Sequence, residues 1–86
     1  MKESIETISI AQVSQKTGVS KNKIKEWHAK GFLPGVRTIS VGSRFHRRFG
    51  EETVLLIQTI NEYQRQGYTL AAAVLKAREL AEGGAL

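Results

Sequence analysis

Apolar and polar residues along the first third of this chain follow the pattern of two short amphipathic helices. Residues 9–17 begin with the Ser-x-x-Gln pattern of a capping box and are followed by Gly18, a residue type that commonly ends helices. Residues 20–30 begin with Ser20, a favourable N-cap, and place an isoleucine, Trp27 and a histidine on one side. We therefore predict two helices separated by a short glycine-containing turn, which is the outline of a helix-turn-helix.

The pattern changes to that of β-strands after Pro34 and Gly35, which interrupt the helical spacing. β-Branched and aromatic residues lie on both sides of a Val-Gly-Ser turn sequence. This arrangement predicts a two-stranded hairpin with strands at Arg37–Val41 and Arg44–Arg48. The second strand is rich in arginine, so we expect the hairpin to be strongly basic.

The last third of the chain returns to helical spacing and predicts a helical hairpin that supplies core. After Gly50, a weak N-cap, an apolar stripe runs from Val54 to Ile60, and Gly67 closes this helix. Thr69 caps a final helix with apolar residues at positions i, i+3, i+4 and i+7. The apolar residues of that pattern are Leu70, Ala73, Val74, Ala77, Leu80 and Ala81.

Length and composition favour one small folded domain. The chain has 86 residues, of which 41% are hydrophobic, enough for a packed core. We expect this domain to span residues 8–82, between flexible ends at residues 1–7 and 83–86. Its apolar runs are too short to cross a bilayer, and the N-terminus lacks the apolar region of a secretory signal, so a cytoplasmic location is expected.

The positive charge is concentrated in the first half of the chain. The net charge is +5, but residues 1–50 carry ten lysines and arginines against three glutamates, whereas residues 51–86 carry three against five. An uneven distribution of this kind favours a polyanionic partner at one face, and nucleic acid is the commonest such partner. The alternative interpretation is a basic surface that only keeps the protein soluble.

The sequence offers little for catalysis or for metal binding. It contains no aspartate and no cysteine, and its two histidines, His28 and His46, are far apart in the chain. A Ser-His-Asp relay therefore lacks its acid, and two histidines do not make a zinc site without further ligands. The glycines are scattered rather than gathered in a phosphate-binding loop. We expect no enzymatic activity, no catalytic residue, no metal and no cofactor.

Several short segments, in a fixed order, resemble the MerR-type DNA-binding domain. They read G-V-S, G-F-L-P, H-R-R-F, G-E-E-T-V and Q-G-Y-T-L, and the resemblance covers Ile8–Leu80. It implies a mainly α fold of the winged helix-turn-helix type. Such a fold has two N-terminal helices, a β-hairpin wing and two C-terminal helices.

The resemblance also implies a DNA-binding role for the second helix and the wing. The helix would enter the major groove, where Asn22 could bond an adenine edge and Lys25 could reach a guanine or a phosphate. The wing arginines would reach the backbone or an adjacent minor groove. The candidate DNA-binding residues are Ser20, Lys21, Asn22, Lys23, Lys25, Arg37, Arg44, His46, Arg47 and Arg48.

The chain also departs from its relatives in ways that leave more than one function open. Glu26 occupies a position where relatives often have an aromatic residue. We also expect no long dimerisation helix and no sensor region of the kind found in the larger relatives. The predicted function is a small transcriptional regulator that binds double-stranded DNA as a homodimer or as side-by-side copies on repeated sites. One alternative is an excisionase-like accessory factor of recombination or plasmid maintenance that bends DNA. Another is a protein-interaction module that uses an apolar strip on the fourth helix.

Overall fold

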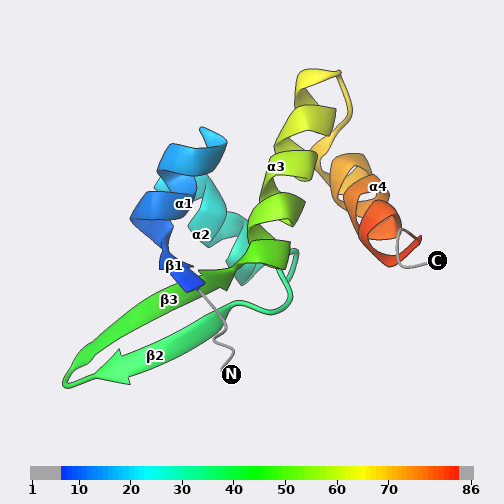
Figure 1. The fold of residues 1–86 in the computed structure, drawn as a ribbon. Coiled ribbons are helices and arrows are strands. Elements are labelled where there is room, and N and C mark those ends of the chain that lie inside the picture. The colour runs from blue at the N-terminus through cyan, green and yellow to red at the C-terminus, as the bar shows by residue number, and fades with distance from the viewer. Residues whose placement is uncertain (1–6, 84–86) are drawn as a thin grey trace.

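The computed structural model describes residues 7–83, which form four helices and a three-stranded antiparallel sheet (Figure 1). The elements along the chain are β1 (Thr7–Ser9), α1 (Ile10–Thr17), α2 (Lys21–Ala29), β2 (Arg37–Val41), β3 (Arg44–Gly50), α3 (Glu51–Arg65) and α4 (Leu70–Gly83). The predicted winged helix-turn-helix fold is therefore confirmed. We call the β2–β3 hairpin the wing.

The helix-turn-helix is built from the local capping signals of the sequence. The Ser9 side chain accepts a hydrogen bond from the Gln12 backbone N–H at 3.3 Å, and the Gln12 side chain accepts one from the Ser9 backbone N–H at 3.1 Å. Gly18 ends α1 with a φ of 77°, a left-handed conformation that suits glycine. Ser20 caps α2 by accepting from the Lys23 backbone N–H at 3.2 Å. These contacts confirm both predicted helix starts.

The core lies where α1, α2, α3, α4 and the inner end of β3 meet. Its largest fully buried side chains are Trp27, Phe49, Ile24, Ile57, Ile60 and Val13. Ile24 and Trp27 are one turn apart on α2, so burying them fixes which side of that helix faces outward. Tyr63 packs against the edge of the core and contacts the Tyr68 ring edge-on, at 5.4 Å between centroids.

The wing follows the predicted strand boundaries at its turn. Val41 pairs with Arg44, so Gly42 and Ser43 form a two-residue loop. Gly42 has a φ of 62° and no non-glycine residue between 7 and 83 has a positive φ, which is the pattern of a type II′ turn. The second strand runs two residues further than predicted, to Gly50, because its inner end is also paired on its other edge.

That additional pairing comes from β1, a strand that the sequence did not predict. The sheet order is β1-β3-β2, with Thr7 opposite Gly50 and Ser9 opposite Arg48. The Arg48 guanidinium donates to the Thr7 carbonyl oxygen at 2.8 Å and to the Thr7 hydroxyl at 3.2 Å. Thr7 was expected in the flexible N-terminal segment, but it lies in this strand. The rest of that segment, residues 1–6, lies outside the described residues.

The helical hairpin of α3 and α4 differs from its predicted pattern at one end. Thr69 accepts from the Ala72 backbone N–H at 3.2 Å, as the predicted cap requires. Ala73, Val74 and Ala77 are buried, but Leu80 is 55% exposed and Ala81 is also exposed. α4 diverges from the first turns of α3 toward its C-terminal end, so this end of the apolar stripe lacks a packing partner there (Figure 1).

The two ends of the helical hairpin give one agreement with the predicted pattern and one difference from it. Gly50 lies at the N-cap of α3 without a side-chain hydrogen bond, so the carboxylates of Glu51 and Glu52 are the favourable groups near its N-terminal dipole. α4 extends to Gly83, which was expected in the flexible tail, and residues 84–86 lie outside the described residues.

We expect Trp27→Ala to destabilise the domain by about 3–5 kcal/mol, because the ring is only 2% exposed and its removal leaves a cavity. That loss is comparable to the whole stability of a domain of this size. Trp27 is the only tryptophan, so the substitution also removes the tryptophan fluorescence that would report unfolding. Circular dichroism during urea unfolding is therefore the suitable measurement. Leu75→Ala is the matched control, because Leu75 is 65% exposed and its loss should change stability by less than about 0.5 kcal/mol. Equal stability of the two variants would contradict this assignment of the core.

Candidate nucleic-acid interface

The outward side of α2 carries the predicted base-reading residues. Lys21, Asn22, Lys23 and Lys25 are all exposed, while Trp27 anchors the opposite side of the helix in the core. The first turn of α2 contains no acidic residue. Lysines therefore stand beside the positive end of the helix dipole, an arrangement that is unfavourable alone and becomes favourable when a phosphate approaches.

Ser20 has a defined structural role at the start of the same helix. Its hydroxyl oxygen accepts the Lys23 backbone N–H, and the hydroxyl hydrogen can still donate to a phosphate oxygen. Its position directly before the exposed lysines is compatible with the predicted contact, which remains a prediction.

The carboxylate of Glu26, on the exposed surface of α2, has a partner on its own helix. Lys30 Nζ lies 3.5 Å from Glu26 Oε2, one helical turn away. Both side chains are about half exposed, so the pair contributes little to stability, on the order of 0.3–0.5 kcal/mol after screening. Its main effect is local neutralisation, which reduces the repulsion that Glu26 would exert on a phosphate.

A hydrogen bond connects α2 with the wing. Arg47 Nε on β3 donates to His28 Nδ1 on α2 at 3.2 Å. Because Nδ1 is the acceptor, the neutral ring in this arrangement carries its proton on Nε2. His28 is half-buried in this contact. The bond brings one arginine of the wing, Arg47, to the helix that carries Lys25.

The two faces of the wing carry different candidate residues. Residues directly opposite each other on antiparallel strands lie on the same face, and faces alternate along a strand. Arg47 pairs with Thr38 and faces α2, so Phe45, two residues away, lies on the same face. The remaining wing candidates lie on the other face, and these are Arg37, Arg44, His46 and Arg48.

Exposure separates these residues further. Arg37, Arg44 and His46 are exposed, so a phosphate or a groove edge can reach them. Arg48 is half-buried and holds β1 against β3 through Thr7, which gives its guanidinium a structural role beside the predicted contact. The sequence predicted these residues as one basic group. The two-residue loop of the hairpin was the signal that could have assigned these residues to the two faces of the wing. It fixes the register of the strands, and the register determines on which face each side chain lies.

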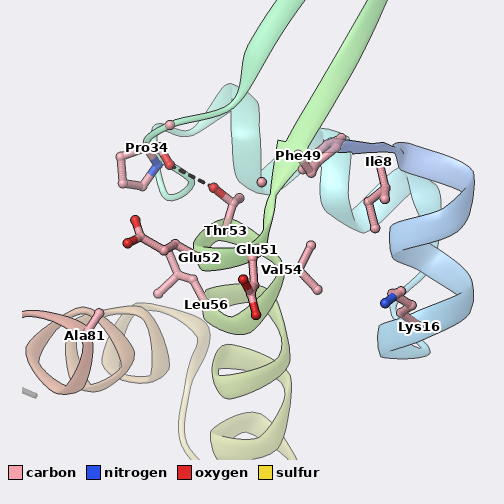
Figure 2. Close-up of a pocket in the computed structure, with 12 residues that line it drawn as sticks. Ile8, Lys16, Pro34, Phe49, Glu51, Glu52, Thr53, Val54, Leu56 and Ala81 are labelled. Atoms are coloured by element: carbon pink, nitrogen blue, oxygen red, sulfur yellow. Dashed lines mark hydrogen bonds between the residues drawn. The ribbon is translucent and has the colours of Figure 1, made fainter. Parts of the chain in front are cut away.

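A hollow of about 740 Å³ lies between the start of α3, the turn at Pro34 and the end of α4 (Figure 2). Its lining combines apolar side chains, such as Leu56 and Ala81, with two carboxylates, Glu51 and Glu52, and one ammonium group, Lys16. Two carboxylates repel a polyanion, so this hollow does not extend the basic surface. Across residues 7–83, no group of three or more His, Cys, Asp or Glu side chains is arranged to hold a metal ion.

The fold and this basic surface define a winged helix-turn-helix protein of the DNA-binding class. The chain matches the family described as MerR HTH family regulatory protein over residues 8–80, which is most of its length. It therefore belongs to the MerR family of DNA-binding regulators, a family of regulatory rather than enzymatic proteins. No curated protein shows significant similarity to the chain. None of the helices within residues 7–83 is long and apolar enough to cross a membrane.

We expect a double-mutant cycle of His28→Ala and Arg47→Ala to give a coupling of about 1 kcal/mol in the free energy of unfolding. The reason is that either substitution alone removes the same hydrogen bond. Urea unfolding of the four proteins measures it. The matched control cycle combines His28→Ala with Arg44→Ala on the opposite face, where the effects should add within about 0.5 kcal/mol. Equal coupling in the two cycles would show that Arg47 and His28 have no specific contact.

Proposed function

We propose that this protein is a small sequence-specific transcriptional regulator that places α2 in the major groove of double-stranded DNA. The wing then lies on the adjacent backbone or minor groove. The observation that carries the proposal is the Arg47–His28 hydrogen bond, because it ties the arginine-rich strand to the lysine-rich helix. A duplex that lies against α2 can therefore meet the lysines of α2 and Arg47 of the wing.

The two elements have different roles in the proposed complex. Asn22 and Lys25 are exposed on α2, and their side chains can hydrogen-bond to base edges in the major groove. Arg44 and Arg37 are exposed on the wing and contribute phosphate contacts that position the protein without reading sequence. Phosphate contacts supply most of the affinity and the base contacts supply the specificity.

A single copy of this size is expected to bind weakly. One small module buries only about 600–1,000 Å² of protein surface on DNA. We therefore propose that copies act as a homodimer or side by side on repeated sites, since linked binding events raise the overall affinity.

The proposal is tested by selecting bound fragments from a random pool of duplex DNA, followed by footprinting of the selected fragment. The expected result is an enriched motif with a footprint whose length and repeat spacing give the number of bound copies. Recovery of unrelated sequences with no protected region would overturn sequence-specific regulation.

We expect Asn22→Ala to reduce discrimination for the selected site by about 1–3 kcal/mol, because a bidentate contact to a base is lost. Its affinity for unrelated DNA should change little. Fluorescence anisotropy with the selected fragment and a scrambled fragment measures both affinities. A parallel loss on both fragments would show that Asn22 does not read sequence.

Arg44→Ala is expected to behave differently, because Arg44 is proposed to contact phosphate. Binding to all sequences should weaken by a similar factor, and the slope of log affinity against log salt should fall by about one. The wild-type protein itself should lose about a thousandfold in affinity or more between about 50 and 200 mM salt if it makes six phosphate contacts. Anisotropy titrations across this salt range measure both quantities. An unchanged slope in the variant would remove Arg44 from the interface.

One observation favours the excisionase-like alternative, a DNA-bending accessory factor. The wing exposes three large apolar side chains, Ile39, Val41 and Phe45, which phosphate contacts alone do not require. The two functions differ in whether the DNA-bound protein also contacts a recombination enzyme of the integrase type, which a simple regulator does not need. Capture of such an enzyme by the protein bound to a strongly bent fragment with several sites would favour the excisionase-like function.

A further inference from the structure

Phe45 is the most exposed of the large apolar side chains that the structure describes, with 74% of its surface accessible. It lies on β3, one residue beyond Arg44 and close to the turn of the wing. Aromatic rings are among the side chains that gain most from burial, so covering this ring in a complex would be favourable.

The face on which Phe45 lies is defined by its neighbours along the strand. Phe49 is buried in the core, Arg47 bonds to α2, and Phe45 is the next residue outward on this side. Two residues of a strand span about 7 Å, so the ring lies roughly that far beyond Arg47. Figure 1 shows the wing projecting beyond the helices, which leaves the outer half of this face open on the side of α2.

The surroundings of the ring indicate the kind of partner it meets. Arg47 lies on the same face, Ser40 lies opposite Phe45, and residues 37–50 contain no carboxylate. A partner must therefore accept cations and also offer an apolar space to an aromatic ring. Duplex DNA does both, because phosphates line the grooves and the stacked bases between them are apolar.

We propose that Phe45 is an apolar wedge that enters the minor groove and separates two stacked base pairs beside the site read by α2. This inference rests on the proposed DNA-binding function and adds a specific contact to it. The minor groove of B-DNA is only about 6 Å wide, too narrow for a hairpin with side chains on both faces. A wedge that opens a base step widens this groove and bends the duplex toward the major groove of that step.

The wedge also adds a preference for sequence outside the bases that α2 reads. Pyrimidine–purine steps unstack most easily, whereas A-tracts are stiff. The step that receives Phe45 is therefore expected to be a pyrimidine–purine step. The wing would select it through its deformability, with no hydrogen bond to its bases.

The test uses the full chain and the selected fragment, with 2-aminopurine placed in turn at each pyrimidine–purine step of the footprint. Binding of the wild-type protein should raise the fluorescence at one step, which reports unstacking. Energy transfer between dyes at the fragment ends should report a bend of about 20–90°. Phe45→Ala should lose most of both signals at saturating protein, and Phe45→Leu, which keeps an apolar wedge, should retain part of them. Leu75→Ala on α4, also exposed, is the matched control and should behave like the wild type.

A further comparison separates the wedge from a general loss of affinity. Replacing the responsive step with an A-tract should weaken the wild type several times more than it weakens Phe45→Ala. If Phe45→Ala binds with an unchanged fluorescence rise and bend, the wedge is wrong and the proposed regulator stands. If the wild-type protein selects and protects no DNA at all, the proposed function fails, and the wedge with it.

Discussion

The burial of Phe49 at the inner end of β3 is the constraint on which the rest of this structure depends. The ring is inaccessible to solvent, and the strand around it is paired with β1 on one edge and β2 on the other. β3 then continues directly into α3, whose first turns also contribute to the core. The inner end of the wing is thereby fixed by the core, whereas its outer end is exposed to solvent. A paired strand is stiff, so the position of the core end determines where the outer end points.

The contact between Arg47 and His28 extends this control to α2. α2 is oriented by Trp27 and Ile24 in the core, and the wing is oriented by Phe49. The hydrogen bond joins the two elements halfway along the strand, beyond the region where packing holds them together. Relative motion of helix and wing would break this bond. In the proposed complex such a link is favourable, because less freedom is lost when DNA binds.

The charge distribution separates stability from binding in this small domain. The carboxylates at the start of α3 lie where the helix dipole favours them. At the other end of α3, the loop to α4 is held by the contact between Tyr63 and Tyr68 and by the Lys76 ammonium over the Tyr68 ring. α2 has the opposite arrangement, with lysines in its first turn and no acid. The lysines in the first turn therefore make α2 slightly less stable by itself, and a bound polyanion would remove this unfavourable interaction with the helix dipole. Its packing through Trp27 makes that loss tolerable.

The sequence by itself determined every feature that depends on residues a few positions apart. These features are the caps at Ser9 and Ser20, the left-handed Gly18, the wing turn and the apolar stripe that begins at Val54. In each of them the interacting residues are three or four positions apart, or they close a two-residue loop. The family resemblance added the order of these parts and the candidate residues of the interface.

Only the tertiary structure decided the features that join distant segments. A three-residue strand at Thr7 is too short to give a periodic signal, and it exists because Arg48, 41 residues away, pairs with it. The partner of His28, the outward direction of Phe45 and the exposure of Leu80 likewise depend on how separate elements pack. Periodicity shows which side of an element is apolar, but it does not show how far along that side a neighbour reaches, because this depends on the relative placement of whole helices and strands.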